Sequence, residues 1–466
     1  MTKRLRKPLA ILDQAKADWL ALSIAPSSFS QLCRAYMFTS ETINEGSPDS
    51  LLHGASVASS WQVLAVTAVS YAGLAMLVLV LSAFGLRLLF RGVLAAPQGR
   101  PGRAVPDAGQ PASATDLFSA IQYTYLVPLS MLATVANFCG LVDITAMPLL
   151  ADIFLGIWRL CAVFGAAVSI AALPLYVLLR PRYHAGDAGI AQQQQHRLAP
   201  WFLLYIPGIV AASTASELAA ILPNQQASSM LVSGYILWGS SVVPALSFTV
   251  VFLKARLGLQ RQPNVHHLVL PLSLLSQTAL GIMTLGIQSQ RVWADSTSGP
   301  ATAPLLLGEM AVAAGAILGM VFWAAAAAWF VSSHLVVLLR TTSPKNMLRA
   351  LGLLVTTRIV AFPVASFAIA TAVFARIWRS MAALALARLL LIYVGVILSG
   401  IYVAMIWSVG SAAFGLFACR NQQLAEMQSQ EAYAENDDRR PCLDRQQIET
   451  AESTDAGSAR QLYGTL

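Results

Sequence analysis

Long apolar segments separated by short polar loops recur along most of the chain. Each is near or above the roughly 20 residues that a helix needs to cross the ~30 Å hydrocarbon core of a bilayer. The clear segments are Trp61–Leu89, Phe118–Val142, Met147–Leu179, Pro200–Leu222, Met230–Leu253, Leu268–Gln288, Leu305–Leu339, Leu351–Ala375 and Met381–Trp407. In lipid the backbone must satisfy its own hydrogen bonds, and these runs lack the alternation of a membrane β-barrel. The pattern predicts an all-α membrane protein.

Basic residues alternate from loop to loop, and this alternation predicts a further span. Most of the Lys and Arg between spans lie near 87–103, 180–197, 254–261 and 340–349. Cytoplasmic loops carry this excess, so the first clear span should end inside the cell. With only the nine clear spans, the basic N-terminus would then lie outside the cell, against the same rule. A weak tenth segment, Trp19–Phe38, interrupted by Pro26 and Arg34, resolves the conflict.

The same pattern divides the chain into three parts. We expect a cytoplasmic N-terminus over 1–18, a transmembrane domain over 19–418 and a disordered cytoplasmic tail over 419–466, where the sequence turns polar and loses its apolar periodicity. Both termini are therefore predicted inside the cell, and the plasma membrane is the expected location.

Composition agrees with a membrane protein and narrows the chemistry. Of 466 residues, 56% are hydrophobic and 11% charged, whereas soluble domains average about 25% charged. The net charge of +8 is spread between the spans, which fits topology and not nucleic-acid binding. The cysteines show no metal-ligand spacing, and no phosphate loop or convergent catalytic set is visible. We therefore expect no enzyme activity, cofactor or metal.

Three stretches resemble one transporter family. They are PNVHHLVLPLSLLSQTALGIMTLG at Pro263–Gly286, WFLLYIPGIVAASTASELAAIL at Trp201–Leu222 and AFPVASFAIATAVF at Ala361–Phe374. They are similar to segments of the tellurite-resistance/dicarboxylate transporter family, which includes fungal sulfite efflux pumps, malic acid permeases and plant slow anion channels. Ser273 and Ser276 stand where the fungal members carry glycine. The order of the stretches agrees with the family plan over about two thirds of the chain.

The resemblance implies ten helices in five helical hairpins, with the odd-numbered helices around a central pore and a degenerate first helix. It also implies a homo-oligomer, commonly a trimer. Each odd-numbered helix holds a proline, at Pro26, Pro128, Pro207, Pro271 and Pro363. An interior proline bends a helix, so we expect kinked inner helices. Pro174 and Pro244 fall on even-numbered helices, which weakens the pattern.

The resemblance also implies a pore gate. The family's gating phenylalanine corresponds to Phe362, directly before Pro363, and an apolar ring in a narrow passage blocks hydrated ions. Ordinary packing is the alternative. Arg358 lies one helical turn earlier, where a charge at the bilayer centre costs at least about 3 kcal/mol. It either attracts anions at the pore mouth or pairs with Glu217 or Glu309.

Small and polar residues on the matching segments are candidates for the pore wall. Hydroxyl and amide groups can replace part of an anion's hydration, although small residues also permit close helix packing. The candidates are Gly208, Ser213, Thr214, Pro271, Gln277 and Gly281.

These features favour a transporter or channel for small inorganic or organic anions. Sulfite export comes first and malate or another C4-dicarboxylate second. A negative charge leaving a cell that is about 100 mV negative inside gains about 2.3 kcal/mol, so export needs no energy-coupling motif. A multi-span receptor or a degenerate, non-transporting relative is the alternative of another class.

Overall fold

The computed structural model describes residues 24, 27–35, 64–75, 77–79, 81–82, 114–139, 148–179, 203–257, 269–295, 302–340, 358–400 and 403. All but Val403 belong to one compact unit, Met1–Ile401, and Val403 belongs to a second, Tyr402–Leu466. The predicted N-terminal part, 1–18, and the predicted tail, 419–466, lie outside the described residues.

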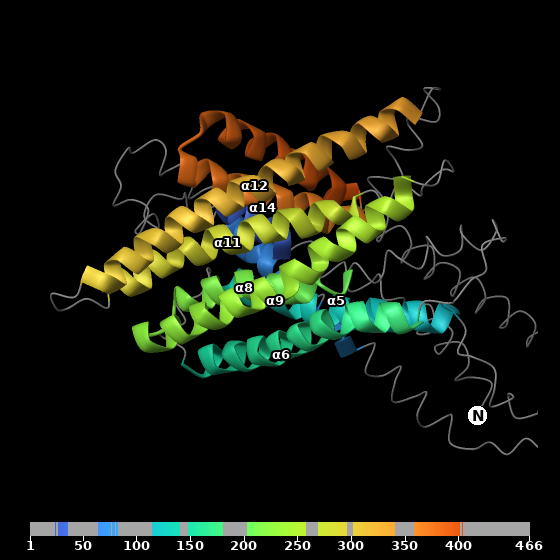
Figure 1. The fold of residues 1–466 in the computed structure, drawn as a ribbon. Helices are drawn as coiled ribbons and strands as arrows, with labels where there is room; N and C mark the ends of the chain where they lie inside the picture. Colours follow the sequence, from blue (N-terminus) through green and yellow to red (C-terminus); the bar gives the residue numbers. More distant parts are fainter. Residues whose placement is uncertain are drawn as a thin grey trace, which may run out of the picture. The chain divides into compact units, whose positions relative to one another are not determined.

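Every regular element in the described ranges is a helix, which confirms the predicted all-α class. The labelled helices are α5 (Ala114–Cys139), α6 (Pro148–Leu179), α8 (Ile206–Ala219), α9 (Asn224–Leu257), α11 (Leu270–Asp295), α12 (Thr302–Arg340) and α14 (Arg358–Trp378) (Figure 1). Helical segments also lie at 27–35, Leu64–Leu79 and Met381–Gly400. Six of these helices are long and apolar enough to cross a membrane.

Consecutive helices pair with each other. α5 contacts α6, α8 contacts α9, and α11 contacts α12. α14 and Met381–Gly400 share a small apolar cluster built on Ala375 and Leu384. The segment 27–35 meets the next helix through Ser30, whose Oγ lies 2.6 Å from Ser70 Oγ. These contacts form five helical pairs in chain order, as the predicted hairpins require.

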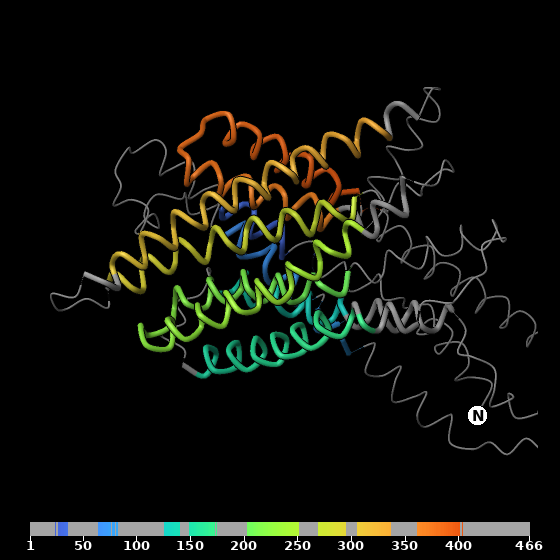
Figure 2. The backbone as a smooth tube through the Cα atoms, in the orientation of Figure 1, coloured from blue at the N-terminus to red at the C-terminus, as the bar shows by residue number. Residues whose placement is uncertain are grey.

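The first helix of each pair is the more buried one. In the spanning part of α11, 89% of the residues are buried, compared with 22% in α12. The same contrast separates α14, at 67%, from Met381–Gly400, at 39%. α11 contacts α8, α9, α12 and α14, and Figure 2 shows its path between α12 and the α8–α9 pair. The first helix of each pair, such as α8, α11 or α14, therefore belongs to an inner layer, and the second helix, such as α9 or α12, to an outer layer.

The outer helices expose large apolar side chains. Leu160, Val163 and Ile170 of α6 are each more than 60% exposed, and Leu389 and Ile392 repeat this on Met381–Gly400. A soluble protein would not leave so much apolar surface in water. These faces are suited to lipid, so the chain is an integral membrane protein.

The structure corrects the prediction of kinked inner helices at two prolines. Pro207 lies in the first turn of α8, and Pro271 is the second residue of α11. In a first turn a proline removes no intrahelical hydrogen bond, so it starts the helix without bending it. Pro128 and Pro363 do lie inside α5 and α14. Pro26 lies outside the described residues.

The turn after α14 is set by two residues. Arg379 adopts a left-handed φ of 47°, and the Ser380 N–H donates to Ala375 O at 3.1 Å, which closes the end of α14. Ser380 Oγ then accepts from the Ala383 N–H at 3.2 Å and caps the next helix. One residue pair thus ends one helix and starts the next.

Glycines bring α11 and α12 into very close contact. A Cβ on Gly286 would lie 2.7 Å from Ala311 O, and a Cβ on Gly315 would lie 2.7 Å from Ile282 O. No side chain larger than hydrogen fits at this separation. Without a hydrophobic driving force between helices in lipid, such backbone approach is a main source of packing energy.

Candidate functional site

Phe362 faces the protein interior. Its ring is half-buried and packs against the apolar cluster formed by α5, α6, α8, α9 and α11. Pro363, beside it, is buried within α14. The ring therefore faces the core and not the lipid side, and its gating role stays a prediction.

A buried amide of α11 joins it to α14 one turn beyond this ring. Gln277 Nε2 of α11 donates to Ser366 Oγ of α14 at 2.7 Å, and both residues are buried. Gln277 Oε1 has no hydrogen-bond partner within the described residues. Gln277 is the predicted wall residue that links directly to the helix of Phe362.

The predicted hydroxyl candidates use their hydrogens within their own helix. Ser213 Oγ and Thr214 Oγ1 both donate to Val210 O, at 2.9 and 2.8 Å. Ser276, one of the two serines that replace family glycines, does the same toward Leu272 O at 2.7 Å. A hydroxyl in this arrangement offers only lone pairs to its surroundings, and an anion needs donors. Their part in lining a pore stays a prediction that requires these hydroxyls to rotate.

The glycine candidates lie at helix contacts. A Cβ on Gly208 would collide with Ser241 Oγ and approach Ser169 Oγ at 3.1 Å, so this glycine lets α8 approach α9 and α6. A Cβ on Gly281 would lie 3.3 Å from Trp238 Cδ1. Both positions have a packing role whether or not they also face a pore. Pro271 is buried at the start of α11.

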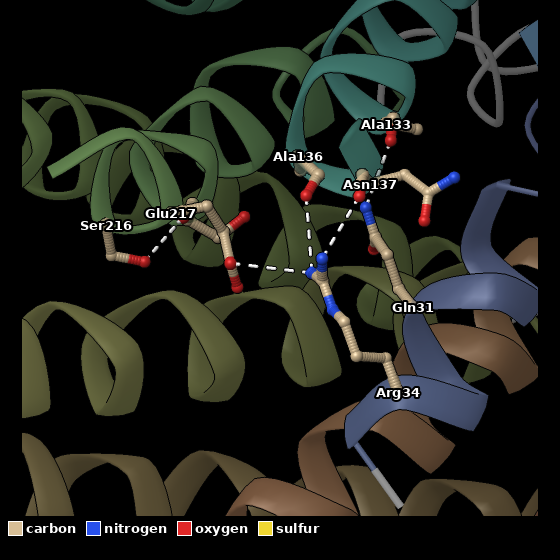
Figure 3. Close-up of polar contacts among 8 residues, drawn as sticks. Gln31, Arg34, Ala133, Ala136, Asn137, Ser216 and Glu217 are labelled. Carbon is tan, nitrogen blue, oxygen red and sulfur yellow. Dashed lines mark hydrogen bonds and ion pairs between the residues drawn. The ribbon is translucent and has the colours of Figure 1, made fainter. Parts of the chain in front are cut away.

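Arg34 and Glu217 form an ion pair that the sequence analysis did not predict. Arg34 Nη2 lies 3.5 Å from Glu217 Oε2 (Figure 3). The Arg34 side chain is 12% exposed and that of Glu217 39%. In the sequence, Arg34 was interpreted only as an interruption of a weak span. An ionisable residue inside a span needs a partner and is a candidate for function, and this rule could have identified Arg34 from the sequence.

One predicted alternative for Arg358 was an ion pair with Glu217, and the structure does not support that pairing. Glu217 interacts electrostatically with Arg376, which lies near the end of α14. Arg358 is the first residue of the same helix, about 27 Å away at 1.5 Å per residue. Glu309 lies exposed on α12, and the side chain of Arg358 lies outside the described part. An anion-attracting role for Arg358 stays a prediction.

Arg34 is held in place by the end of α5. Its Nη1 donates to Asn137 O at 3.0 Å and its Nη2 to Ala136 O at 3.3 Å (Figure 3). Gln31, one turn earlier, donates to Ala133 O at 3.0 Å. The last carbonyls of a helix lack intrahelical donors and carry partial negative charge, so a guanidinium satisfies both needs.

The ends of the inner helices meet at this position. Arg34 near the end of 27–35 contacts the end of α5 and Glu217 of α8, and Arg376 of α14 interacts with Glu217. Near the end of α11, Arg291 Nη1 donates to Ala220 O at 3.2 Å, directly after α8. On the predicted topology, this end of the inner layer is extracellular. A charged cluster therefore lies at one mouth of the inner layer.

The chain is thus an integral membrane protein of paired helices, and its mostly apolar inner layer buries several polar side chains. The family model SLAC1, voltage-dependent anion channel, matches residues 46–410. The chain belongs to this family, which confirms the resemblance seen in its sequence.

Two curated fungal proteins are also similar over part of their length. The sulfite efflux pump SSU1 of Arthroderma otae is 29% identical over 135 residues, which is 28% of this chain and 35% of the relative. The sulfite efflux pump SSU1 of Arthroderma benhamiae is 27% identical over 178 residues, 37% of this chain and 44% of the relative. The chain thus spans less than half the length of these relatives.

Proposed function

We propose that this protein moves small anions across the plasma membrane, with sulfite efflux as its main activity. The observation that carries the proposal is the match of the anion-channel family over residues 46–410. The similarity to two fungal sulfite efflux pumps favours sulfite over malate or another C4-dicarboxylate. A homo-oligomer, such as a trimer, is part of the proposal.

The inner layer would form the conducting path and Phe362 its gate. The ring is the large apolar side chain directly before the interior proline of α14, and it faces the core. While it fills the passage, a hydrated anion meets an apolar constriction and does not pass. Movement of the ring opens the path, and the membrane potential then drives the anion outward.

Purified protein in sulfite-loaded vesicles tests this proposal. An inside-negative potential should drive sulfite release from vesicles that contain the protein and not from empty ones. Malate-loaded vesicles in parallel decide between the two substrate classes. Release of neither anion, with the protein shown to be folded, would favour the receptor or degenerate relative instead.

A further inference from the structure

The two partners of the Arg34–Glu217 pair are held very differently. Arg34 is mostly buried and donates to two backbone carbonyls, so its position does not depend on Glu217. Glu217 is 39% exposed, and its carboxylate stands 3.5 Å from the guanidinium. Charge-assisted hydrogen bonds of this kind are usually about 2.7–2.9 Å long. The Glu217 carboxylate is therefore the movable partner of the pair, and the Arg34 guanidinium is the fixed one.

A second cation lies within electrostatic range of the carboxylate. Arg376 interacts electrostatically with Glu217 and lies on α14, the helix that carries Phe362. Three cations of the cluster, Arg34, Arg376 and Arg291, outnumber Glu217. A small anion arriving here would lower the excess positive charge, and Glu217 would keep a cationic neighbour after leaving Arg34. The exchange leaves no charge without a counter-charge, which would otherwise be the main penalty.

We propose that Glu217 is a tethered anion that occupies Arg34 in the resting protein, and that a transported oxyanion binds Arg34 by displacing it. The inference rests on the proposed transport function and adds a binding site for its substrate. Sulfite and a carboxylate both present oxygen acceptors with negative charge, which the guanidinium fork accepts in the same geometry. Glu217 then sets how much external or exiting anion is needed to fill the site.

The alternative is a static ion pair that only joins 27–35 to α8. Its geometry argues against this, because 27–35 is already attached to α5 by three side-chain to backbone hydrogen bonds. A long, half-exposed pair adds little to such an anchor. A static pair also predicts a different result when the carboxylate is neutralised, because its loss would weaken folding without strengthening anion binding.

The experiment compares Glu217→Gln with a matched acidic control, Glu309→Gln, in sulfite-loaded vesicles. Glu309 is exposed on α12 near the same end of the inner layer, since its neighbour Gly308 packs on Gln290 of α11, so it controls for the loss of an acidic charge there. Removal of the competing charge should lower the half-saturating sulfite concentration about two- to fivefold in Glu217→Gln. Glu309→Gln should leave it unchanged. Glu217→Asp, which keeps the charge but shortens the reach to Arg34, should shift it in the same direction by less.

A binding readout separates this inference from the transport proposal. Sulfite should raise the unfolding temperature of detergent-solubilised Glu217→Gln more than that of the wild type. If wild-type vesicles release no sulfite but this difference holds, the transport proposal fails and the site stands. If the wild type transports and Glu217→Gln shows an unchanged or higher half-saturating concentration, the pair is static and the inference is overturned. Arg34→Gln should raise that concentration at least fivefold, whereas Arg159→Gln, on the exposed face of α6, should leave it unchanged.

Discussion

The contact between α11 and α12 predicts that a single methyl group at Gly315 destabilises the protein. A Cβ there would lie 2.7 Å from Ile282 O, about 0.7 Å short of the 3.4 Å at which ordinary contact begins. The obstacle is backbone, so no side chain can rotate away. α12 must shift, and overpacking of this kind costs about 1–3 kcal/mol. Better helix propensity returns at most about 1 kcal/mol.

Two other glycines provide controls for the propensity term. A Cβ on Gly156 of α6 or Gly239 of α9 would meet nothing within 4 Å. Gly156→Ala and Gly239→Ala should therefore match or exceed the wild type in thermal unfolding followed in detergent. Gly315→Ala should unfold at a lower temperature than either. The reasoning is refuted if Gly315→Ala unfolds at the same temperature as Gly156→Ala or above it.

Three further predictions concern α14 and the turn that follows it. Phe362→Ala should increase sulfite release from vesicles because it empties the gate, and unchanged or slower release would remove Phe362 from this role. Arg358→Gln should lower the selectivity for anions over cations, measured as a shift of the reversal potential in planar bilayers; an unshifted potential would contradict it. Ser380→Ala should reduce stability by about 1 kcal/mol through loss of the cap on the Ala383 N–H, measured by thermal unfolding; an unchanged unfolding temperature would argue against the cap.

The outer helices were the part of the fold that the sequence predicted best. α6, α9 and α12 are long and continuously apolar because their exposed faces meet lipid, and their predicted spans overlap the observed helices closely. α8 shows the opposite case. Within its predicted span, Pro200–Leu222, the helix runs over Ile206–Ala219, because Pro207 starts it and the residues after Ala219 form a turn.

The candidate site was predicted only where a local pattern existed. Phe362 and Pro363 were recognised from the Phe-Pro dipeptide that resembles the family's ninth helix, and Gln277 from the short stretch that resembles a family segment. The Arg34–Glu217 pair joins two helices far apart in the chain, and nothing in the local sequence tells which cation meets which acid. Arg358 was given Glu217 as a possible partner on proximity to a span alone. Helix direction excludes this, because Glu217 lies near the opposite end of α14.

The weakest predicted span, Trp19–Phe38, contributes Arg34 to this charged cluster. A helix facing lipid must be apolar, but a helix enclosed by other helices can carry Gln31 and Arg34, since carbonyls of α5 receive their donors. The mean hydropathy of a span can therefore be lower where the segment is surrounded by other helices than where it faces lipid. In a protein of this class, the polar interruptions that make a span hard to recognise mark the inner layer. Charged residues in weak spans are thus the first positions to test for anion binding.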